Sequence, residues 1–330
     1  MRSQAMGLAN AIKAQLAEGQ TCEIVEKTAN LNSWGKYFPG HLNPFPFHTL
    51  SKDSSSFDKE IWPDILISCG RRSSAISIAI GKKSKGKTYR VHIQNPQTPT
   101  SYFDLVASMQ HDALKGSNVI DTKTALHKLN RQTLEQEGTH WHSIWQSQNL
   151  LTSGENQQTK QPPILGVCLG GKNKKFGFDE TSLSNLINCL ENARQNHNAT
   201  ILLTPSSRTE PFVKTALNAH FKSDDRVWIW DQKGDNPYFG ILANADHLLI
   251  TADSVSMISE GLFTGVPVHI LPLNGTSRRH KIFLENLKSD NLIHHTDKMI
   301  DFSVKGSKEP IDETAKVAQI ILEKLQNQSS

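Results

Sequence analysis

The sequence predicts an α/β protein of two Rossmann-like domains that face a cleft. Its 330 residues exceed one typical domain and suit two. Both halves repeat the same order of short apolar strand, small turn residues and amphipathic helix. The strands show little alternation of apolar and polar residues, which is typical of a parallel sheet covered on both faces.

Composition and charge exclude several classes of protein. No apolar run approaches the roughly 20 residues that a membrane span needs. The formal charge of +4 is a mild bias that suits an anionic ligand, or a peripheral contact with the inner face of the membrane. No basic run with interleaved aromatic residues indicates nucleic acid as a partner. We therefore expect a cytoplasmic protein.

The cysteines indicate a reducing compartment. None forms a CxxC pair, and those within apolar runs behave as small hydrophobic residues. We expect all four to be reduced: Cys22, Cys69, Cys168 and Cys189.

The first half opens with a helix and continues with short strands. Apolar residues recur at helical spacing at Met6, Ala9, Ile12 and Leu16. Strands are then expected at 65–69, within 87–96, around 105–107 and at 118–120, with a turn at 70–72 and a helix from Ser73.

Residues 128–163 interrupt this pattern. They are polar and end in Pro162–Pro163, so we expect the domain linker at 153–163. The predicted domains are an N-terminal, acceptor-side domain at 1–152, a nucleotide-binding domain at 164–305 and a C-terminal helix at 306–330.

The second half alternates regularly between strand and helix. Strands are expected at 163–169, 199–205, 226–232, 246–251 and 267–273, with helices at 181–197, 211–221, 236–245 and 254–265. Open sheets of this kind bind ligands outside the carboxyl ends of their strands, so site residues are expected in the turns that follow the strands.

Two of these turns carry groups suited to phosphate. Gly170 and Gly171 follow a strand, so their backbone N–H groups can approach an anion, and Lys172 adds charge. Ser206 and Arg208 follow the next strand, where the guanidinium can clamp a phosphate in bidentate fashion. The alternatives are an ordinary tight turn and a solvated loop arginine.

The strongest pattern is TADSVSMISEGLFTGVPV. Thr251 ends a strand, and Asp253, Ser254 and Ser256 occupy the turn and first helical turn, where free N–H groups and the positive helix end attract an anion. Glu260 lies four residues after Ser256 on the same helix face and can accept hydrogen bonds from ribose hydroxyls. The alternative is an exposed helical glutamate beside ordinary capping residues.

These residues carry a resemblance. The run from Ala245 to Pro272 resembles the donor-nucleotide half of B-type glycosyltransferases. The chain also resembles the mitochondrial fission "elongated mitochondria" (ELM) family and its bacterial members. The phrases that carry this, in order, are RSQAMGLANAI, NPQTPTSYFDLV followed by HD, GSNVI, VCLGGKNKKFGF, LLTPSSRTE and DNPYFGILANADHLLITADSVSMISEGLFTGVPV.

The resemblance implies a B-type glycosyltransferase-like fold with the donor pocket in the second domain. Glu260 would bind ribose, and Asp253, Ser254 and Ser256 would line the diphosphate together with Gly170–Gly171. It implies no metal and no cofactor beyond a nucleotide diphosphate sugar as donor substrate. Relatives begin with a strand before the helix that matches RSQAMGLANAI, so either the natural start lies upstream or the first sheet lacks that strand.

A base for transfer is expected from the first domain. His111 and Asp112 follow a strand, and a histidine of near-neutral pKa can accept the proton of an acceptor hydroxyl. The alternative is a loop histidine bonded to backbone. Arg71 and Arg72 can bind an anionic acceptor. The pairs His140/His142 and His294/His295 have no ligand partner at metal spacing and are interpreted as surface residues.

Three functions remain open at this point. The leading hypothesis is a metal-independent glycosyltransferase that acts on a cell-envelope or lipid-linked acceptor. The second is a non-catalytic adaptor that recruits a protein partner, as plant members of the family recruit a dynamin-like GTPase. The third is a nucleotide-sugar epimerase, which shares the pocket but needs no acceptor.

Overall fold

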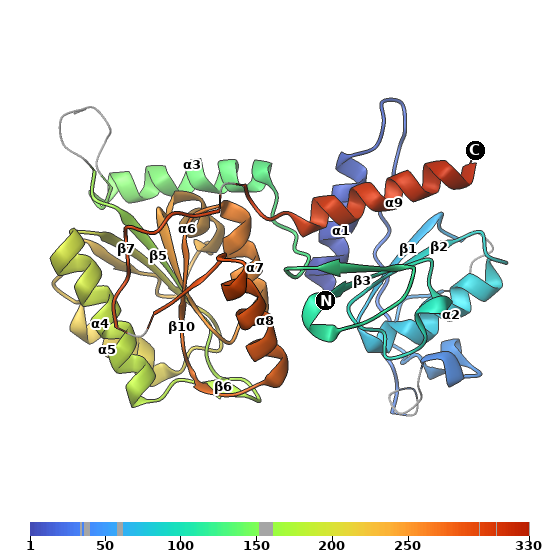
Figure 1. The fold of residues 1–330 in the computed structure, drawn as a ribbon, viewed down its shortest axis with the longest axis horizontal. Coiled ribbons are helices and arrows are strands. Elements are labelled where there is room, and N and C mark those ends of the chain that lie inside the picture. The colour runs from blue at the N-terminus through green and yellow to red at the C-terminus, as the bar shows by residue number, and fades with distance from the viewer. Residues whose placement is uncertain are drawn as a thin grey trace. The chain divides into compact units, whose positions relative to one another are not determined.

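The computed structural model describes residues 1–33, 35, 40–57, 62–151, 161–296, 298–307 and 309–329. It divides into two compact units (Figure 1). The first unit is formed by Met1–Lys128 with Asp312–Ser330, and the second by Leu129–Ile311. Each unit contains its own parallel sheet, which confirms the predicted α/β fold class.

The first unit has a parallel sheet in the simple order β1-β2-β3-β4. Its regular elements are α1 (Arg2–Ala14), β1 (Ile65–Cys69), α2 (Ser74–Lys83), β2 (Tyr89–Ile93), β3 (Leu105–Met109), β4 (Val119–Thr122) and α9 (Glu313–Ser329). Every adjacent pair of strands is parallel, with Cys69 opposite Ile93 at one end of the first pair. The carboxyl ends of the strands therefore lie along one edge.

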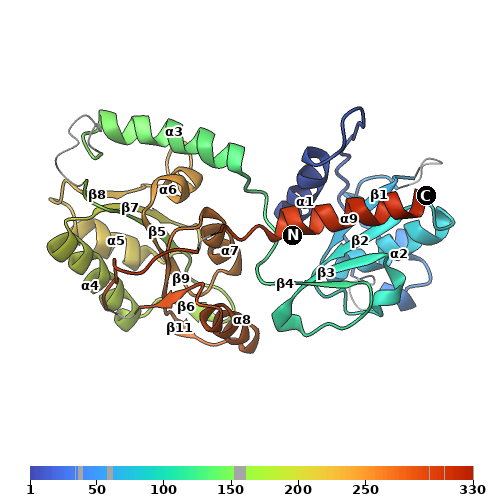
Figure 2. The same cartoon turned by 45° about the horizontal axis from the view of Figure 1, so that its top comes forward.

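Helices cover both faces of this sheet. On one face α1 and α9 lie side by side (Figure 2) and share a core with the strands, in which Leu8 contacts residues such as Val91 and Val317. On the other face α2 packs through Ile78 against Phe103 and Val106. The last helix of the chain thus completes the core of the first unit.

The first helix is shorter than its sequence pattern suggested. It ends at Ala14, before Leu16, and its buried positions are Gly7, Leu8 and Ile12. Gly7 lets the backbone of α1 lie close to the backbone at His127, because a Cβ on Gly7 would lie 2.2 Å from the His127 carbonyl oxygen. This contact sets which side of α1 faces the core.

The second unit has a six-stranded parallel sheet within the described residues, in the order β12-β10-β9-β5-β7-β8. Its strands and helices are α3 (Arg131–Ser147), β5 (Ile164–Leu169), β6 (Phe176–Gly177), α4 (Glu180–His197), β7 (Thr200–Pro205), α5 (Pro211–His220), β8 (Val227–Ile229), α6 (Tyr238–Asn244), β9 (His247–Thr251), α7 (Val255–Thr264), β10 (Val268–Leu271), β11 (Asn274–Gly275), α8 (Arg278–Ser289) and β12 (His294–His295).

The order of these strands places a topological switch point between β5 and β9. Numbered along the chain within this sheet, the strands run 3-2-1-4-5-6, as in dinucleotide-binding folds. Successive connections from β5 lead one way, to β7 and β8, and those from β9 lead the other way. The loops after β5 and β9 therefore diverge and leave a crevice where such folds bind ligands.

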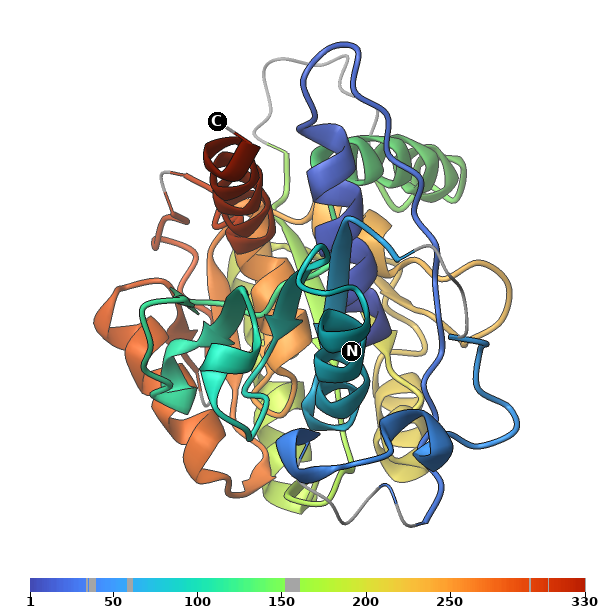
Figure 3. The ribbon, with the colours of Figure 1, turned by 90° about the vertical axis from the view of Figure 1, so that its right-hand side faces the viewer.

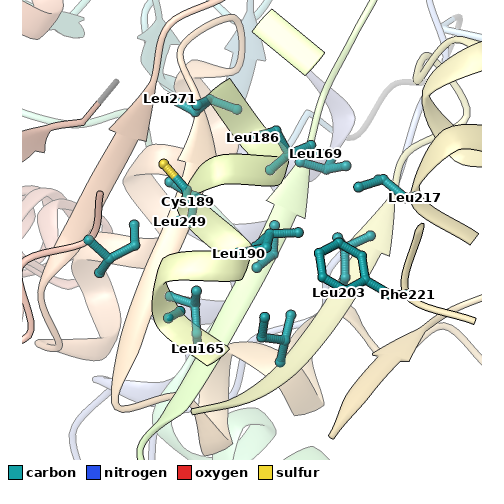
Figure 4. Close-up of a cluster of buried hydrophobic side chains, with 14 of the residues drawn as sticks. Leu165, Leu169, Leu186, Cys189, Leu190, Leu203, Leu217, Phe221, Leu249 and Leu271 are labelled. Atoms are coloured by element: carbon teal, nitrogen blue, oxygen red, sulfur yellow. The ribbon is translucent and has the colours of Figure 1, made fainter. Parts of the chain in front are cut away.

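The core of the second unit lies on both faces of this sheet. Residues at alternate positions of β5, such as Leu165 and Leu169, pack with Leu186 and Leu190 of α4 (Figure 4). On the opposite face, Gly166 lets α6 approach, because a Cβ there would lie 2.9 Å from the Ile241 side chain. Both faces are thus buried, which explains the unbroken apolar strands.

Helix α3 corrects the sequence interpretation, which treated residues 128–163 as a break in the pattern. Asn130 caps the helix by accepting a hydrogen bond from the Thr133 N–H at 2.8 Å. Leu134, Trp141 and Trp145 are buried along one face. Because α3 packs on α6, it belongs to the second unit and not to the first.

The two units therefore differ from the expected bounds at both ends: α3 joins the second unit, and α9 joins the first. As limits of independently folding domains, 1–152, 164–305 and 306–330 stay a prediction. Most of the linker expected at 153–163 lies outside the described residues. Among the described residues, no helix is long and apolar enough to cross a membrane.

Candidate functional site

The candidate site of the second unit is built where β5 and β9 end side by side. Thr251, the last residue of β9, is fully buried, and its Oγ1 accepts a hydrogen bond from the Gly170 N–H at 2.7 Å. This bond fixes the turn after β5 against the end of β9. Two predicted site residues from distant parts of the sequence are thus in direct contact at the switch point.

Asp253 occupies the space above this turn. Its side chain is fully buried, and Oδ2 accepts a hydrogen bond from the Gly171 N–H at 3.3 Å. The same oxygen forms an ion pair with Arg208 Nη1, 3.0 Å away. A Cβ on Gly170 would lie 2.1 Å from Asp253 Oδ1. Gly170 therefore lacks a side chain because the Asp253 carboxylate needs the room.

Gly171 has a different reason for being glycine. Its φ of +142° lies in a region that side chains disfavour, and a Cβ there would lie 2.4 Å from the Arg208 carbonyl oxygen. That carbonyl also accepts a hydrogen bond from the Lys172 N–H at 2.9 Å, while the Lys172 side chain is exposed. The turns after β5 and β7 are therefore joined through their backbones.

Ser206 holds the second of these turns. Its Oγ donates to the Gly170 carbonyl at 3.1 Å and accepts from the Arg208 N–H at 3.2 Å. The hydroxyl is thus engaged within the protein. Ser206 shapes the path of the chain that presents Arg208.

Arg208 is a cation that stays accessible at this edge. Its side chain is 38% exposed, although Asp253 holds one of its nitrogens. A guanidinium has five N–H donors in one plane, so an arginine oriented by one carboxylate still presents donors to an anion. The ion pair therefore orients Arg208 without using up its hydrogen-bonding capacity.

The N-terminus of α7 lies directly after Asp253. Ser254 caps the helix, its Oγ accepting from the Met257 N–H at 3.4 Å, and Ser256 is exposed in the first turn. The first N–H groups of a helix have no partner within it and carry the positive end of its dipole. This end of α7 is suited to an anionic oxygen.

Glu260 lies further along α7, four residues after Ser256. Tyr238, at the start of α6, donates its hydroxyl to Glu260 Oε2 at 2.7 Å. Burial, and then the negative charge of Glu260, raise the pKa of Tyr238 well above its ordinary value, so the phenol keeps its proton and stays a donor. Burial, followed by the charge of Glu260, also raises the pKa of Cys168 on β5.

Three residues of this region were not identified from the sequence. Tyr238 orients Glu260, and Thr209 is buried with its Oγ1 donating to the Leu169 carbonyl at 3.2 Å. His280 of α8 has its Nε2 3.1 Å from the Asp253 carbonyl oxygen. The sequence gives no local indication of these three residues, because each contacts a residue at least 22 positions away along the chain.

The expected base lies in the first unit, after β3. His111 and Asp112 form part of a 3-10 turn, with His111 Nε2 3.7 Å from Asp112 Oδ1. Ser108 Oγ donates to Asp112 Oδ2 at 3.2 Å. Arg71 and Arg72 lie in another 3-10 turn, directly after β1. The first unit thus brings its candidates to the carboxyl edge of its sheet.

The remaining histidine pairs are placed as follows. His142 Nδ1 lies 2.8 Å from Asn244 Oδ1 in the α3–α6 contact, and His140 is exposed. His294 lies beside His269 across adjacent strands, with ring centroids 5.6 Å apart. Among the described residues, no group of three His, Cys, Asp or Glu side chains is arranged to hold a metal ion.

Comparison with known proteins places the chain in a family. Residues 1–325 match the family model described as mitochondrial fission ELM1. The chain belongs to this family. The predicted resemblance is therefore confirmed over nearly the whole sequence.

Two relatives of this ELM1-family chain show how far the similarity extends. It is 27% identical over 301 residues to an uncharacterized protein, RP120, of Rickettsia prowazekii (strain Madrid E), with 85% of each chain covered. It is 25% identical over 290 residues to mitochondrial fission protein ELM1 of Arabidopsis thaliana, covering 80% of this chain and 64% of that longer protein.

A solved structure supports the fold of the ELM1-family chain. UDP-GlcNAc 2-epimerase from Neisseria meningitidis, bound to UDP-GlcNAc, matches with a TM-score of 0.50 and 13% sequence identity. The match covers 80% of this chain and 76% of the epimerase. At this identity the similarity shows the fold alone.

Proposed function

We propose that this chain binds a nucleotide diphosphate sugar at the switch point of its second unit and transfers the sugar to an acceptor. The observation that carries the proposal is the ion pair that brings Arg208, from the turn after β7, onto Asp253 directly before α7, the helix that also carries the oriented Glu260. Open α/β sheets bind nucleotides at this place. The epimerase of similar fold is bound to UDP-GlcNAc, a ligand of this class.

Each group has a distinct task in this proposal. The first N–H groups of α7, near Ser254 and Ser256, and the guanidinium of Arg208 bind the diphosphate. Lys172 adds positive charge from the exposed side of the turn. Glu260 accepts hydrogen bonds from the ribose hydroxyls, and Tyr238 holds its carboxylate in place.

Asp253 acts on the ligand through Arg208 rather than by direct contact. A carboxylate beside a diphosphate would repel it, whereas a buried carboxylate that orients an arginine makes that arginine a better ligand. Gly170 and Gly171 make this arrangement possible, because one leaves room for Asp253 and the other for the Arg208 backbone.

The transfer step needs a base for the acceptor. We assign this role to His111, with Asp112 beside it: the imidazole takes the proton of the acceptor hydroxyl, the oxygen bonds to the anomeric carbon, and the nucleotide diphosphate leaves with the electrons of the broken bond. A cell-envelope or lipid-linked acceptor fits a cytoplasmic protein that makes peripheral contact with the inner face of the membrane.

Calorimetric titration of the full chain with nucleotide diphosphate sugars tests the proposal. Wild type is expected to bind at least one of them saturably, and Glu260→Ala to bind about tenfold or more weakly, because hydrogen bonds to a charged group are lost. The matched control is Glu180→Ala, which removes an exposed glutamate from the first turn of α4 and should bind as wild type does. The absence of saturable binding, or equal binding by wild type and Glu260→Ala, would contradict the proposal.

A second candidate is a nucleotide-sugar epimerase. The observation that favours it is the similar fold of an epimerase bound to UDP-GlcNAc. The two reactions separate in one assay, because epimerisation of the sugar nucleotide needs no acceptor. A changed sugar nucleotide after incubation without acceptor would favour the epimerase, and a chemically unchanged one the transferase.

The third candidate is an adaptor without catalysis. The observation that favours it is family membership, since the Arabidopsis relative is named a mitochondrial fission protein. Recovery of a membrane-remodelling GTPase with the chain, together with no effect of any nucleotide sugar, would favour this candidate over both enzymes.

A further inference from the structure

Two glutamine side chains meet at the carboxyl edge of the sheet in the first unit. Gln4, at the start of α1, accepts a hydrogen bond from Gln94 Nε2 at 2.9 Å through its Oε1. The same oxygen accepts from the Cys69 thiol at 3.4 Å. Burial raises the pKa of Cys69 to about 11, so the thiol keeps its proton and stays a donor. Figure 3 shows α1 in dark blue with its start marked N, and this helix contacts β1, which ends at Cys69.

The paired carboxamides leave one donor group and one acceptor open to a ligand. Gln4 Nε2 and Gln94 Oε1 form no hydrogen bond with any of the described residues, and both residues are half-buried. An amide nitrogen donates and an amide oxygen accepts, so the pair matches a hydroxyl group, which does both. Gln94 Oε1 lies 3.6 Å from the position that a Cβ on Gly70 would take, which places it beside the turn after β1.

The backbone at Gln94 has a conformation that glutamine disfavours. Its φ of +73° lies in the left-handed region, where glycine is the usual residue and where other residues are found mainly at functional sites. In the described part of the first unit, the non-glycine residues with positive φ are Lys85, Gln94, Gln97 and Ala113. All but Lys85 lie in turns that follow β2 or β3. A glutamine kept where glycine would suit the backbone better indicates that its side chain is needed.

The turn that carries Gln94 is held by its neighbours. Ser74, at the start of α2, donates its hydroxyl to the Pro96 carbonyl at 3.1 Å. Gln97 Oε1 accepts a hydrogen bond from Arg71 Nη1 at 3.5 Å. This contact places Arg71, an exposed cation of the turn after β1, against the same turn. The carboxamides and the guanidinium thus belong to two turns that touch each other.

These groups select a ligand by its chemistry. A hydroxyl group matches the open donor and acceptor of the two carboxamides. An anionic group matches the guanidinium, which has five N–H donors in one plane. A sugar that carries a phosphate offers both groups, whereas inorganic phosphate lacks the sugar hydroxyls and an uncharged sugar lacks the anion.

We propose that Gln4, Gln94 and Arg71 form a binding site for a phosphorylated sugar. The inference deepens the proposed function by naming the chemical class of the acceptor, and it rests on the proposed function for that role alone. His111 follows β3 at the same edge, because β2 and β3 are parallel and Ile93 lies opposite Ala107. A sugar held by the carboxamides is therefore bound at the edge that carries the expected base.

Calorimetric titration of the full chain with sugar phosphates tests the site. The probes are glucose 1-phosphate, N-acetylglucosamine 1-phosphate and mannose 1-phosphate, each with UDP present at saturation to fill the nucleotide site. Wild type is expected to bind at least one of them saturably. The corresponding free sugar and inorganic phosphate should each bind at least about tenfold more weakly, because each lacks half of the contacts.

Gln4→Glu is the sharpest variant. It keeps an oxygen that accepts from Cys69 and Gln94 but replaces the NH2 donor with a second oxygen. Binding of the sugar phosphate should weaken by about tenfold while the fold is kept. The matched control Asn10→Asp adds the same charge on the exposed side of α1 and should bind as wild type does.

Gln94→Gly separates a binding role from a structural one. Because glycine suits the left-handed backbone, the midpoint of thermal unfolding should stay within about 3 °C of wild type, while binding of the sugar phosphate is lost. Lys85→Gly, at an exposed left-handed position after α2, is the matched control and should keep binding. A large fall in the midpoint with unchanged binding would show that Gln94 only joins α1 to β2.

The proposal is overturned if none of the three probes binds wild type, or if inorganic phosphate binds as tightly as the sugar phosphates. It is also overturned if Gln4→Glu and Gln94→Gly bind the probe as wild type does. Both variants lie in the first unit and should bind UDP normally. Failure of this site is therefore distinct from failure of the nucleotide site.

Discussion

The space that Asp253 occupies above Gly170 in the candidate site yields a prediction at the scale of single residues. Gly170→Ala should destabilise the protein by about 1–3 kcal/mol, because its Cβ would overlap the buried Asp253 carboxylate. In the background of Asp253→Ser, which shortens that side chain, the same substitution should cost about 1–2 kcal/mol less.

Chemical denaturation of the four proteins of this double-mutant cycle measures the coupling. Additive costs of the two substitutions would show that Gly170 is glycine for some reason other than Asp253. Gly171→Ala serves as comparison, because it meets the Arg208 backbone and should not be rescued by Asp253→Ser.

Tyr238 gives a second prediction at this scale. Tyr238→Phe removes only the hydroxyl that donates to Glu260, so nucleotide-sugar binding should weaken by about fivefold while the fold is kept. The matched control is Tyr102→Phe, in the first unit. Binding by Tyr238→Phe that equals wild type in calorimetry would mean that Glu260 needs no orienting partner.

Individual residues also show what the sequence could and could not predict. The turn and helix around Asp253, Ser254 and Glu260 were predicted, because capping chemistry and helical spacing are local. The ion pair between Asp253 and Arg208 was not predicted, because the two residues lie far apart in the sequence and are brought together only by the order of the strands in the sheet.

At the scale of elements, α3 is held by aromatic packing on α6. A Cβ on Gly240 would lie 2.3 Å from Trp141 Cδ1, so Gly240→Ala should destabilise the second unit by about 1–3 kcal/mol. Gln136→Ala, on the exposed side of α3, should leave stability within about 0.5 kcal/mol of wild type. Thermal unfolding compares the two, and equal effects would contradict this packing.

The helix α3 was missed in the sequence for a physical reason. Its composition is polar, yet Leu134, Trp141 and Trp145 recur at spacings of seven and four, which places them on one face. That narrow stripe suffices because tryptophan buries much area per residue. The strand–helix alternation of the second half was predicted because its strands are apolar throughout.

At the scale of the whole molecule, each unit buries a histidine that should make it sensitive to acid. Burial lowers the pKa of His92 in the first unit to about 3, and burial, with the neighbouring His247, lowers that of His269 in the second unit to about 3. Both values lie below the unfolded value of about 6.5, so the unfolded chain binds more protons in between.

The contribution of these two histidines to the free energy of unfolding is therefore fully present above about pH 6.5. It is lost as the pH falls toward 3, at up to about 1.4 kcal/mol per pH unit for each histidine. His269→Gln should reduce the slope of unfolding free energy against pH by up to about 1.4 kcal/mol per pH unit, because one fewer proton is taken up. The control His48→Gln, at an exposed position, should leave the slope unchanged. Denaturant unfolding across this pH range measures the slope, and an unchanged slope in His269→Gln would contradict the assignment.

The division into units was the part of the architecture that the sequence described least well. The last helix was predicted as a helix, but its partner α1 lies at the other end of the chain, where Gln15 Nε2 donates to the Ala315 carbonyl at 3.1 Å. Sequence patterns report periodicity within an element and carry no record of such distant partners.

Amide hydrogen exchange of the full chain, with and without UDP-GlcNAc, tests the nucleotide site most directly. Protection is predicted in two segments of the second unit, the turn at 170–172 and the first turn of α7 at 255–257, because a bound diphosphate occupies their surroundings. Glu260→Ala should reduce this protection at the same ligand concentration. Absence of protection in both segments at saturating ligand, or protection confined to the first unit, would contradict the account.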